Sequence, residues 1–100
     1  AEPGDSVDIP VDVAHSRSYV FRTIGYQSFD LADWAVEVDG TALETWRGYA
    51  PIPRRVEGPW SSPVRLERGR HTITFRCVGR DPASRGTLGF FDYVEAVEAP

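Results

Sequence analysis

The sequence predicts an all-β fold, a two-sheet antiparallel β-sandwich. Short segments rich in β-branched and aromatic residues recur along the chain, with turn signals roughly every ten residues. No stretch keeps a helical period over three turns. Seven or eight such strands in a chain of 100 residues are typical of a two-layer sandwich. We therefore expect residues 1–100 to form one module.

The first half of the chain contains four predicted strands. Residues 7–13 alternate apolar and non-apolar side chains, which indicates a half-buried strand. Residues 18–24 and 34–38 are rich in β-branched and aromatic side chains. Asp39-Gly40 is a tight-turn signal, because glycine accepts a positive φ. Residues 41–43 are therefore expected to return as the hairpin partner of the third strand.

The second half begins with a predicted long loop. Residues 47–63 contain four prolines, which exclude a helix and a central strand, and loops of this length are often functional. Residues 64–66 form a short predicted strand, and residues 71–78 alternate like a core strand. Residues 79–86 are a turn or loop, and residues 87–97 are the last predicted strand.

The last predicted strand is apolar on both faces. Strict alternation places Phe90 and Val94 on one face and Phe91 and Tyr93 on the other. A strand with two apolar faces is covered on both sides. Phe91 and Tyr93 are therefore expected either to form an interface with a neighbouring domain or subunit, or to lie beneath the long loop.

Composition narrows the class of protein. Hydrophobic residues make up 41% of the chain, so it can bury a core, and the net charge of −4 argues against a nucleic-acid binder. No apolar run approaches the ~18–20 residues of a membrane span. Cys77 is the only cysteine, so no internal disulfide is expected. All 11 basic residues are arginine, which reflects either coding bias or selection for forked donors.

Five segments occur in an order that covers nearly the whole chain: GDxV at residues 4–7, VEVDG at 36–40, LERGRHTITF at 66–75, GRDPAS at 79–84 and GFFDYV at 89–94. Together they resemble the galactose-binding-domain-like jelly-roll modules attached to bacterial glycoside-active enzymes, including carbohydrate-binding modules. The resemblance implies an antiparallel jelly roll and a non-catalytic accessory module within a larger protein. It also implies an extracellular or cell-surface location and a neighbouring catalytic domain as a partner.

Sugar binding by such sandwiches needs aromatic rings for the apolar sugar faces and polar groups for the hydroxyls. The candidates in or beside the proline-rich loop are Trp46, Tyr49, Arg54, Arg55 and Trp60. We expect the rings to stack on a poly- or oligosaccharide and the arginines to donate to hydroxyls or acidic sugars. The alternative for the rings of Tyr49 and Trp60 is that they close the end of the sandwich. The alternative function is a structural or assembly domain, in which Phe91 and Tyr93 are buried against a partner and no sugar binds.

Other aromatic residues have different predicted roles. Trp34 shares a face with Val36 and Val38 and is expected in the core. Tyr26 and Phe29 are expected to be either loop anchors or contacts at the rim of a site.

No cofactor is expected. Many sugar-binding relatives begin with a further strand whose acidic residue helps to hold a structural calcium ion, and this sequence lacks that strand before Asp5. Asp92 lies among apolar residues and is expected to accept hydrogen bonds from backbone amides or an arginine. The alternative is a metal site that Asp92 forms with Asp5 or Glu95.

Catalysis is not predicted. The sequence holds no metal, redox or nucleophile motif of known spacing. The acid pairs Asp30 with Asp33 and Glu37 with Asp39 are interpreted as solvated carboxylates, because no cleft is indicated between them. Cys77 shares a face with core residues and is expected to be an inert buried thiol.

Overall fold

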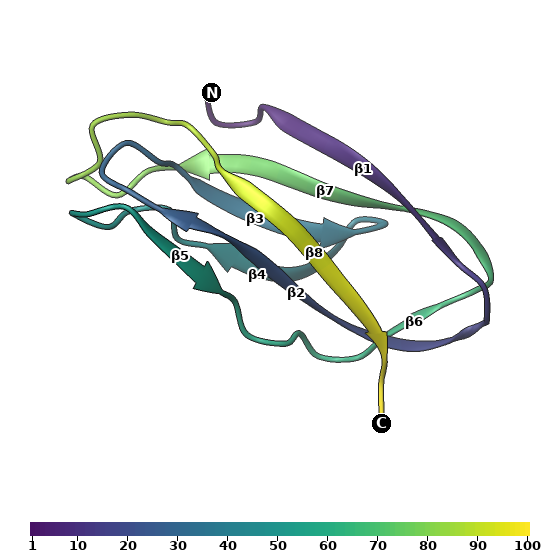
Figure 1. Ribbon diagram of the computed structural model, residues 1–100. Helices are drawn as coiled ribbons and strands as arrows, with labels where there is room; N and C mark the ends of the chain where they lie inside the picture. The colour runs from purple at the N-terminus through teal and green to yellow at the C-terminus, as the bar shows by residue number, and fades with distance from the viewer.

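The computed structural model describes all 100 residues and is a sandwich of two antiparallel β-sheets (Figure 1). The fold class predicted from the sequence is confirmed. The structure has eight strands: β1 (Ser6–Val13), β2 (Arg17–Gln27), β3 (Asp33–Val38), β4 (Thr41–Trp46), β5 (Arg54–Glu57), β6 (Val64–Leu66), β7 (Gly69–Gly79) and β8 (Phe91–Glu98). It has no helix that is long and apolar enough to span a membrane.

The two sheets differ in width. The first sheet has four strands in the order β1-β7-β3-β4. In the second sheet Ile24 of β2 pairs with Glu57 of β5 on one side and with Tyr93 of β8 on the other. Tyr19 of β2 pairs with β6 and β8 in the same way. β5 and β6 therefore follow each other along one side of β2, and the second sheet is only three strands wide.

The predicted hairpin between the third and fourth strands is confirmed. Asp39 and Gly40 have φ angles of 48° and 81°, as a two-residue turn with left-handed central residues requires. β4 extends to Trp46, beyond the predicted residues 41–43, because a register shift at Val36 and Glu37 lets pairing with β3 continue.

The core lies between the sheets, where the alternating apolar residues of both meet. β2 directs Phe21 inward, β3 directs Trp34 and β7 directs Phe75, and each of these side chains is at most 6% exposed. The predictions that Trp34 and Cys77 lie in the core are confirmed. Full burial of one large apolar side chain stabilises a fold by about 1.5–3 kcal/mol. The core residues are Val13, Tyr19, Phe21, Ala32, Trp34, Val36, Val38, Trp46, Leu66, Ile73, Phe75 and Cys77.

The predicted loop over residues 47–63 is wrong in its middle. Arg54–Glu57 forms strand β5, which pairs with the end of β2. All four prolines of the segment lie outside these bounds, so none removes a hydrogen bond from the ladder. Arg54 and Arg55 therefore lie on a strand and not on a loop.

The face assignment of the last strand is corrected by a β-bulge. Tyr93 pairs with Ile24 and Phe91 pairs with Gly25, and Asp92 between them has no partner on β2. The extra residue changes the alternation, so that Phe91 and Tyr93 point to opposite sides of the sheet. The prediction that both share an outer face is therefore wrong for Phe91.

Phe91 lies inside the sandwich. Its ring packs against Phe75 at a centroid distance of 4.3 Å and meets Trp34 at 5.7 Å and Trp46 at 6.0 Å. Tyr93 stays on the outer face and is 45% exposed. The strand also begins later than predicted, because the residues before Phe91 close the loop end of the sandwich.

Candidate functional site

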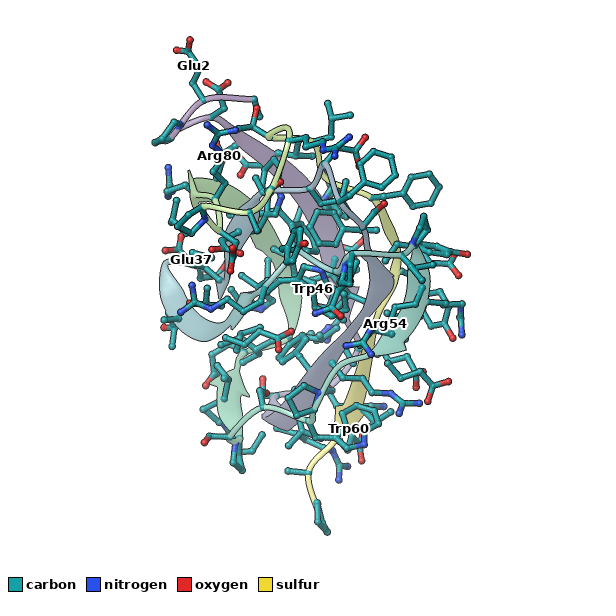
Figure 2. All side chains as sticks on the ribbon, turned by 90° about the vertical axis from the view of Figure 1, so that its left-hand side faces the viewer. Glu2, Glu37, Trp46, Arg54, Trp60 and Arg80 are labelled. Atoms are coloured by element: carbon teal, nitrogen blue, oxygen red, sulfur yellow. The ribbon has the colours of Figure 1, made fainter.

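The five predicted sugar-binding residues do not form one site, and the ring of Trp46 is buried. β4 continues through Trp46, whose side chain is turned into the core and is only 5% exposed. Its Nε1 donates a hydrogen bond to the carbonyl of Tyr26 at 3.3 Å. Figure 2 shows the ring within the body of the protein. A buried ring cannot stack on a sugar, so the prediction for Trp46 is wrong.

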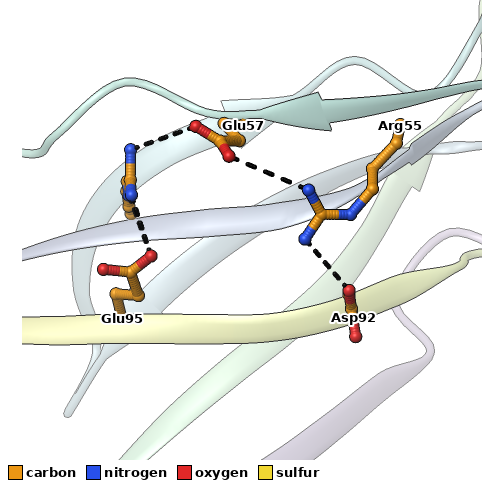
Figure 3. A network of polar contacts seen from close by, with 5 residues as sticks. Arg55, Glu57, Asp92 and Glu95 are labelled. Atoms are coloured by element: carbon orange, nitrogen blue, oxygen red, sulfur yellow. Dashed lines mark hydrogen bonds and ion pairs between the residues drawn. The ribbon is translucent and has the colours of Figure 1, made fainter.

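Arg55 belongs to an ion network on the outer face of the second sheet. Its guanidinium group contacts Asp92 at 3.2 Å and Glu57 at 3.8 Å. Arg22 continues the network to Glu57 at 3.5 Å and to Glu95 at 2.9 Å (Figure 3). The expectation that Asp92 accepts from an arginine is confirmed. Partly exposed pairs of this kind contribute about 0–1 kcal/mol each, so a ligand can displace them at low cost.

Trp60 lies beside this network at Arg22, whereas Arg54 pairs with Gln27 at the far end of β2. The guanidinium of Arg22 lies 4.6 Å from the centre of the Trp60 ring, and that of Arg55 lies 6.0 Å from the centre of the Tyr93 ring. Each of these two rings therefore already forms a cation–π contact with an arginine of the protein. Trp60 remains 43% exposed.

Tyr49 and Arg54 lie at the other end of the sandwich. Tyr49 forms an isolated parallel bridge with Ser28, and Arg54 Nε donates a hydrogen bond to Gln27 Oε1 at 2.8 Å. Both line a shallow hollow of about 300 Å³ in the proline-rich segment. Ile52 lines the same hollow and is 73% exposed.

A larger pocket of about 420 Å³ opens beside this hollow, and we call it the loop-end pocket. Pro53 lines the pocket, and its two neighbours in the chain, Ile52 and Arg54, line the hollow. The pocket is formed by the end of β2 with the connection from β2 to β3, by the residue before β5 and by the approach to β8. Its lining residues are Tyr26, Ser28, Asp30, Leu31, Pro53, Leu88, Gly89 and Phe90.

The lining of the pocket combines two aromatic residues with one acidic residue. Tyr26 and Phe90 pack edge to face, with ring centroids 4.8 Å apart and planes at 82°, and Phe90 is 60% exposed. Asp30 is the only acidic or basic residue in the lining. Its carboxylate forms no ion pair with any arginine. Such a pocket can contact an apolar ring face and accept hydrogen bonds.

Buried polar contacts hold the loops that form the pocket. Asp33 accepts a hydrogen bond from the Gly48 backbone N–H at 3.2 Å and pairs with Arg47 at 3.2 Å. Ser84 Oγ donates a hydrogen bond to the carbonyl of Leu31 at 2.9 Å. Asp33 is 8% exposed, so its interpretation as a solvated carboxylate is wrong. Hydrogen bonds and an ion pair therefore hold the connections around the pocket in place.

Sequence reasoning missed most of this pocket. It left Tyr26 as either an anchor or a rim contact, and the structure places Tyr26 in the wall. Gly25 is the sequence feature that could have indicated this pocket. A Cβ there would lie 2.9 Å from the carbonyl oxygen of Phe90, so glycine is what lets the approach to β8 come close to β2.

The carboxylates considered as metal ligands have other partners. Asp92 pairs with Arg55, Glu95 pairs with Arg22, and Asp5 accepts a hydrogen bond from the backbone N–H of Glu2. No three His, Cys, Asp or Glu side chains are grouped so that they could hold a metal ion.

Comparison with solved structures gives clear matches of the fold. A xanthan lyase from Paenibacillus matches with a TM-score of 0.77 and 15% identity over 98% of this chain. A family 35 carbohydrate-binding module from an environmental isolate matches with a TM-score of 0.64 and 14% identity over 95%. The CBM36-1 domain of a multidomain xylanase from the hindgut metagenome of Trinervitermes trinervoides matches with a TM-score of 0.62 and 20% identity over 99%.

The chain spans about a tenth of the xanthan lyase chain, and 66% and 75% of the two carbohydrate-binding chains. No family model matches the sequence, and no curated protein does. At these identities the matches define a shared fold. The predicted resemblance to galactose-binding-domain-like jelly-roll modules is thereby confirmed for the architecture.

Proposed function

We propose that this chain is a non-catalytic accessory module that binds carbohydrate at the loop-end pocket. The observation that carries the proposal is the pocket itself, in which two packed aromatic residues, Tyr26 and Phe90, and the acidic residue Asp30 line one opening. The architecture is similar to that of two carbohydrate-binding modules, which supports the assignment.

Each residue has a defined role in the proposed site. The rings of Tyr26 and Phe90 contact the C–H groups of one sugar unit, and Asp30 accepts hydrogen bonds from its hydroxyls. The next unit of the chain passes over Pro53 into the hollow lined by Tyr49 and Arg54. Two of the residues predicted from the sequence thus form a second subsite, and the pocket forms the first.

The charge of the pocket favours neutral or amino sugars over acidic ones. Asp30 is its only acidic or basic residue, and Arg54 lies in the adjoining hollow, where it already donates to Gln27. A uronic acid would place a second carboxylate beside Asp30 in a partly desolvated site, which is unfavourable. The sequence left open whether the arginines meet hydroxyls or acidic sugars, and the proposed first subsite favours a ligand with hydroxyls and no carboxylate.

The proposed biological role is to keep a catalytic domain near its substrate. A weak binding module raises the effective concentration of a linked enzyme at a polysaccharide surface without taking part in the reaction. In this role residues 1–100 are one module of a larger extracellular or cell-surface protein, and a glycoside-active domain is the natural partner.

The test is calorimetric titration of the purified chain with neutral, amino and acidic oligosaccharides. We expect saturable binding of a neutral or amino sugar, and a loss of about tenfold or more in affinity for Phe90→Ala. Asp30→Asn should weaken amino-sugar binding and reduce the discrimination against uronic acids. The matched control is Trp60→Ala, which removes an exposed ring outside the pocket and should leave affinity unchanged.

Two results would contradict the proposal. No binding to any glycan in the panel would remove carbohydrate recognition altogether. Loss of affinity in Trp60→Ala, with Phe90→Ala unaffected, would move the site to the outer face of the second sheet, where Trp60 and Arg55 lie.

A further inference from the structure

One carboxylate of the loop-end pocket has no partner in the protein. Asp30 is half-buried, and its side chain forms neither an ion pair nor a hydrogen bond. Every other aspartate accepts a hydrogen bond from a backbone N–H or from a side chain: Asp5, Asp8, Asp12, Asp33, Asp39, Asp81 and Asp92. The acceptor sites of Asp30 are therefore free for a ligand.

Ser28 adds a second free acceptor to the pocket. It is 9% exposed, and its hydroxyl forms no hydrogen bond with the protein. Because no fully buried side-chain oxygen or nitrogen lacks a partner, the small exposed part of Ser28 includes its hydroxyl. Ser28 belongs to the lining of the loop-end pocket. The hydroxyl is therefore accessible from the pocket.

Backbone contacts hold Asp30 in place before a ligand binds. The N–H of Leu88 donates to the carbonyl of Asp30 at 3.1 Å, and the N–H of Arg85 donates to the carbonyl of Phe29 at 2.7 Å. Gly86 packs against the same segment, since a Cβ there would lie 2.8 Å from the carbonyl oxygen of Asp30. These connections meet at one end of the sandwich (Figure 1). A ligand that binds the carboxylate therefore loses little free energy in ordering the site.

The side chains of the lining match a cation. None of them is basic and none is an amide, so a ligand carboxylate would find no positive charge there. An ammonium group has three N–H donors and no acceptor, and Asp30 and Ser28 can accept from it. Aromatic faces also attract positive charge, and Phe90, which is 60% exposed, offers the more accessible ring of the pocket. A neutral hydroxyl would gain the hydrogen bonds without the charge pairing.

We propose that the sugar unit in the loop-end pocket carries a protonated amine, so that the ligand is a glycan containing de-N-acetylated hexosamine. The inference rests on the proposed function and narrows its ligand class. The ammonium group pairs with Asp30 and donates to Ser28, and the ring of Phe90 contacts the same unit. The adjoining hollow contains Arg54 and no carboxylate, so only the unit in the pocket needs the amine.

The experiment compares three ligands that differ in one substituent. They are the β-1,4-linked tetramers of glucosamine, of N-acetylglucosamine and of glucose, titrated calorimetrically at about pH 5.5, where the sugar amines carry a proton. We expect the glucosamine tetramer to bind at least about tenfold more tightly than either of the others. This advantage should shrink in about 0.5 M salt, because the pocket is open to solvent and the charge pairing is screened.

Two matched variants locate the charge that is responsible. Asp30→Asn should weaken binding of the glucosamine tetramer about tenfold or more and should remove its advantage over the glucose tetramer. Asp8→Asn is the control, because it makes the same change of charge on β1, outside the pocket, where the only hydrogen bond of the side chain comes from the Thr74 hydroxyl. If Asp30→Asn does not fold, the ranking of the three tetramers on the unaltered chain decides the question.

The outcomes separate this inference from the proposed function. Binding of a neutral glycan that Phe90→Ala weakens, with no advantage for the glucosamine tetramer, would leave the sugar site in place and overturn the ammonium assignment. Absence of binding to every glycan would remove both. Equal losses in Asp30→Asn and Asp8→Asn would show that the chain attracts the tetramer only through its net negative charge. Tighter binding of a trilysine peptide than of the glucosamine tetramer would show that the pocket recognises a basic polypeptide instead of a sugar.

Discussion

At the scale of single residues, His71 links the β3–β4 hairpin to the connection between β6 and β7 through both of its ring nitrogens. Nδ1 lies 2.5 Å from the carboxylate of Asp39, and Nε2 lies 2.6 Å from the carbonyl oxygen of Glu67. Only the imidazolium form can donate to both acceptors at once. The Glu67 carbonyl and then the Asp39 carboxylate raise the pKa of His71 above 6.5. The backbone N–H of Thr72 and the His71 ring lower the pKa of Asp39.

The pH dependence of stability follows from these shifts. Because the folded-state pKa of His71 is raised, its contribution is fully present below the unfolded value of 6.5 and is lost as pH rises through the folded value. His71→Asn should therefore lower the melting temperature by a few degrees in mildly acidic buffer and by progressively less at alkaline pH.

His15→Asn is the matched control for this prediction, since the His15 ring is exposed in the turn after β1. Melting curves of both variants from pH 5 to 9 make the measurement. A His71 effect that grew with pH, or one that His15→Asn reproduced, would contradict the role of the imidazolium.

The tryptophans show how far individual residues can be assigned from sequence. Trp34 is predictable as a core residue because its own strand alternates clearly. Trp46 resembles a surface ring in the sequence because it stands beside a proline-rich segment. Its burial depends on the extension of β4 across a register shift with β3, and local sequence does not encode that shift.

At the scale of elements, the contact between the β4–β5 connection and the start of β3 depends on a glycine. A Cβ at Gly48 would lie 2.0 Å from the carbonyl oxygen of Ala32, which is backbone and cannot rotate away. Gly48→Ala should therefore destabilise the fold by about 2–4 kcal/mol, as forced overpacking does.

Gly40→Ala is the comparison for this prediction. Gly40 has a φ of +81°, and no atom lies within 4 Å of the place that a Cβ would occupy, so only backbone strain opposes the substitution. Its expected cost is about 1 kcal/mol. Urea unfolding of both variants provides the free energies. Equal losses would mean that the close approach at Gly48 relaxes freely.

Elements were predictable wherever one periodic signal dominated. Most of β1, β2, β6 and β7 is recognisable from alternation, although β2 runs on to Gln27. β5 is hidden because four prolines surround a short stretch whose pairing partner, the end of β2, is distant in sequence. The bulge at Asp92 is also hidden, because it exists only in the register between β8 and β2.

At the scale of the whole molecule, the sandwich is elongated and the proposed sugar site lies at its loop end. The molecule measures 42 × 24 × 18 Å. The pocket is lined by residues of β2, of the connection from β2 to β3 and of the approach to β8, and by the residue before β5, so separate parts of the chain meet there.

The single core predicts cooperative unfolding of the isolated chain. Trp34 and Trp46 are 6% and 5% exposed, and both contact the Phe91 ring in the interior that the two sheets share. Their fluorescence should therefore report loss of packing between the sheets at the same urea concentration at which far-ultraviolet circular dichroism reports loss of strands. Two separated transitions would show that the sheets do not unfold as one unit.

The sequence by itself determined that this protein is a two-sheet β-sandwich and where most of its strands lie. These properties follow from alternation and turn chemistry, which act between residues close together in the chain. The resemblance to a family of modules rests instead on five sequence segments and their order. Only the tertiary structure decided where the proposed sugar site lies. The pocket of Tyr26, Asp30 and Phe90 joins segments far apart in sequence. Its existence depends on strand register and on the close approach of the chain before β8 to Gly25 of β2.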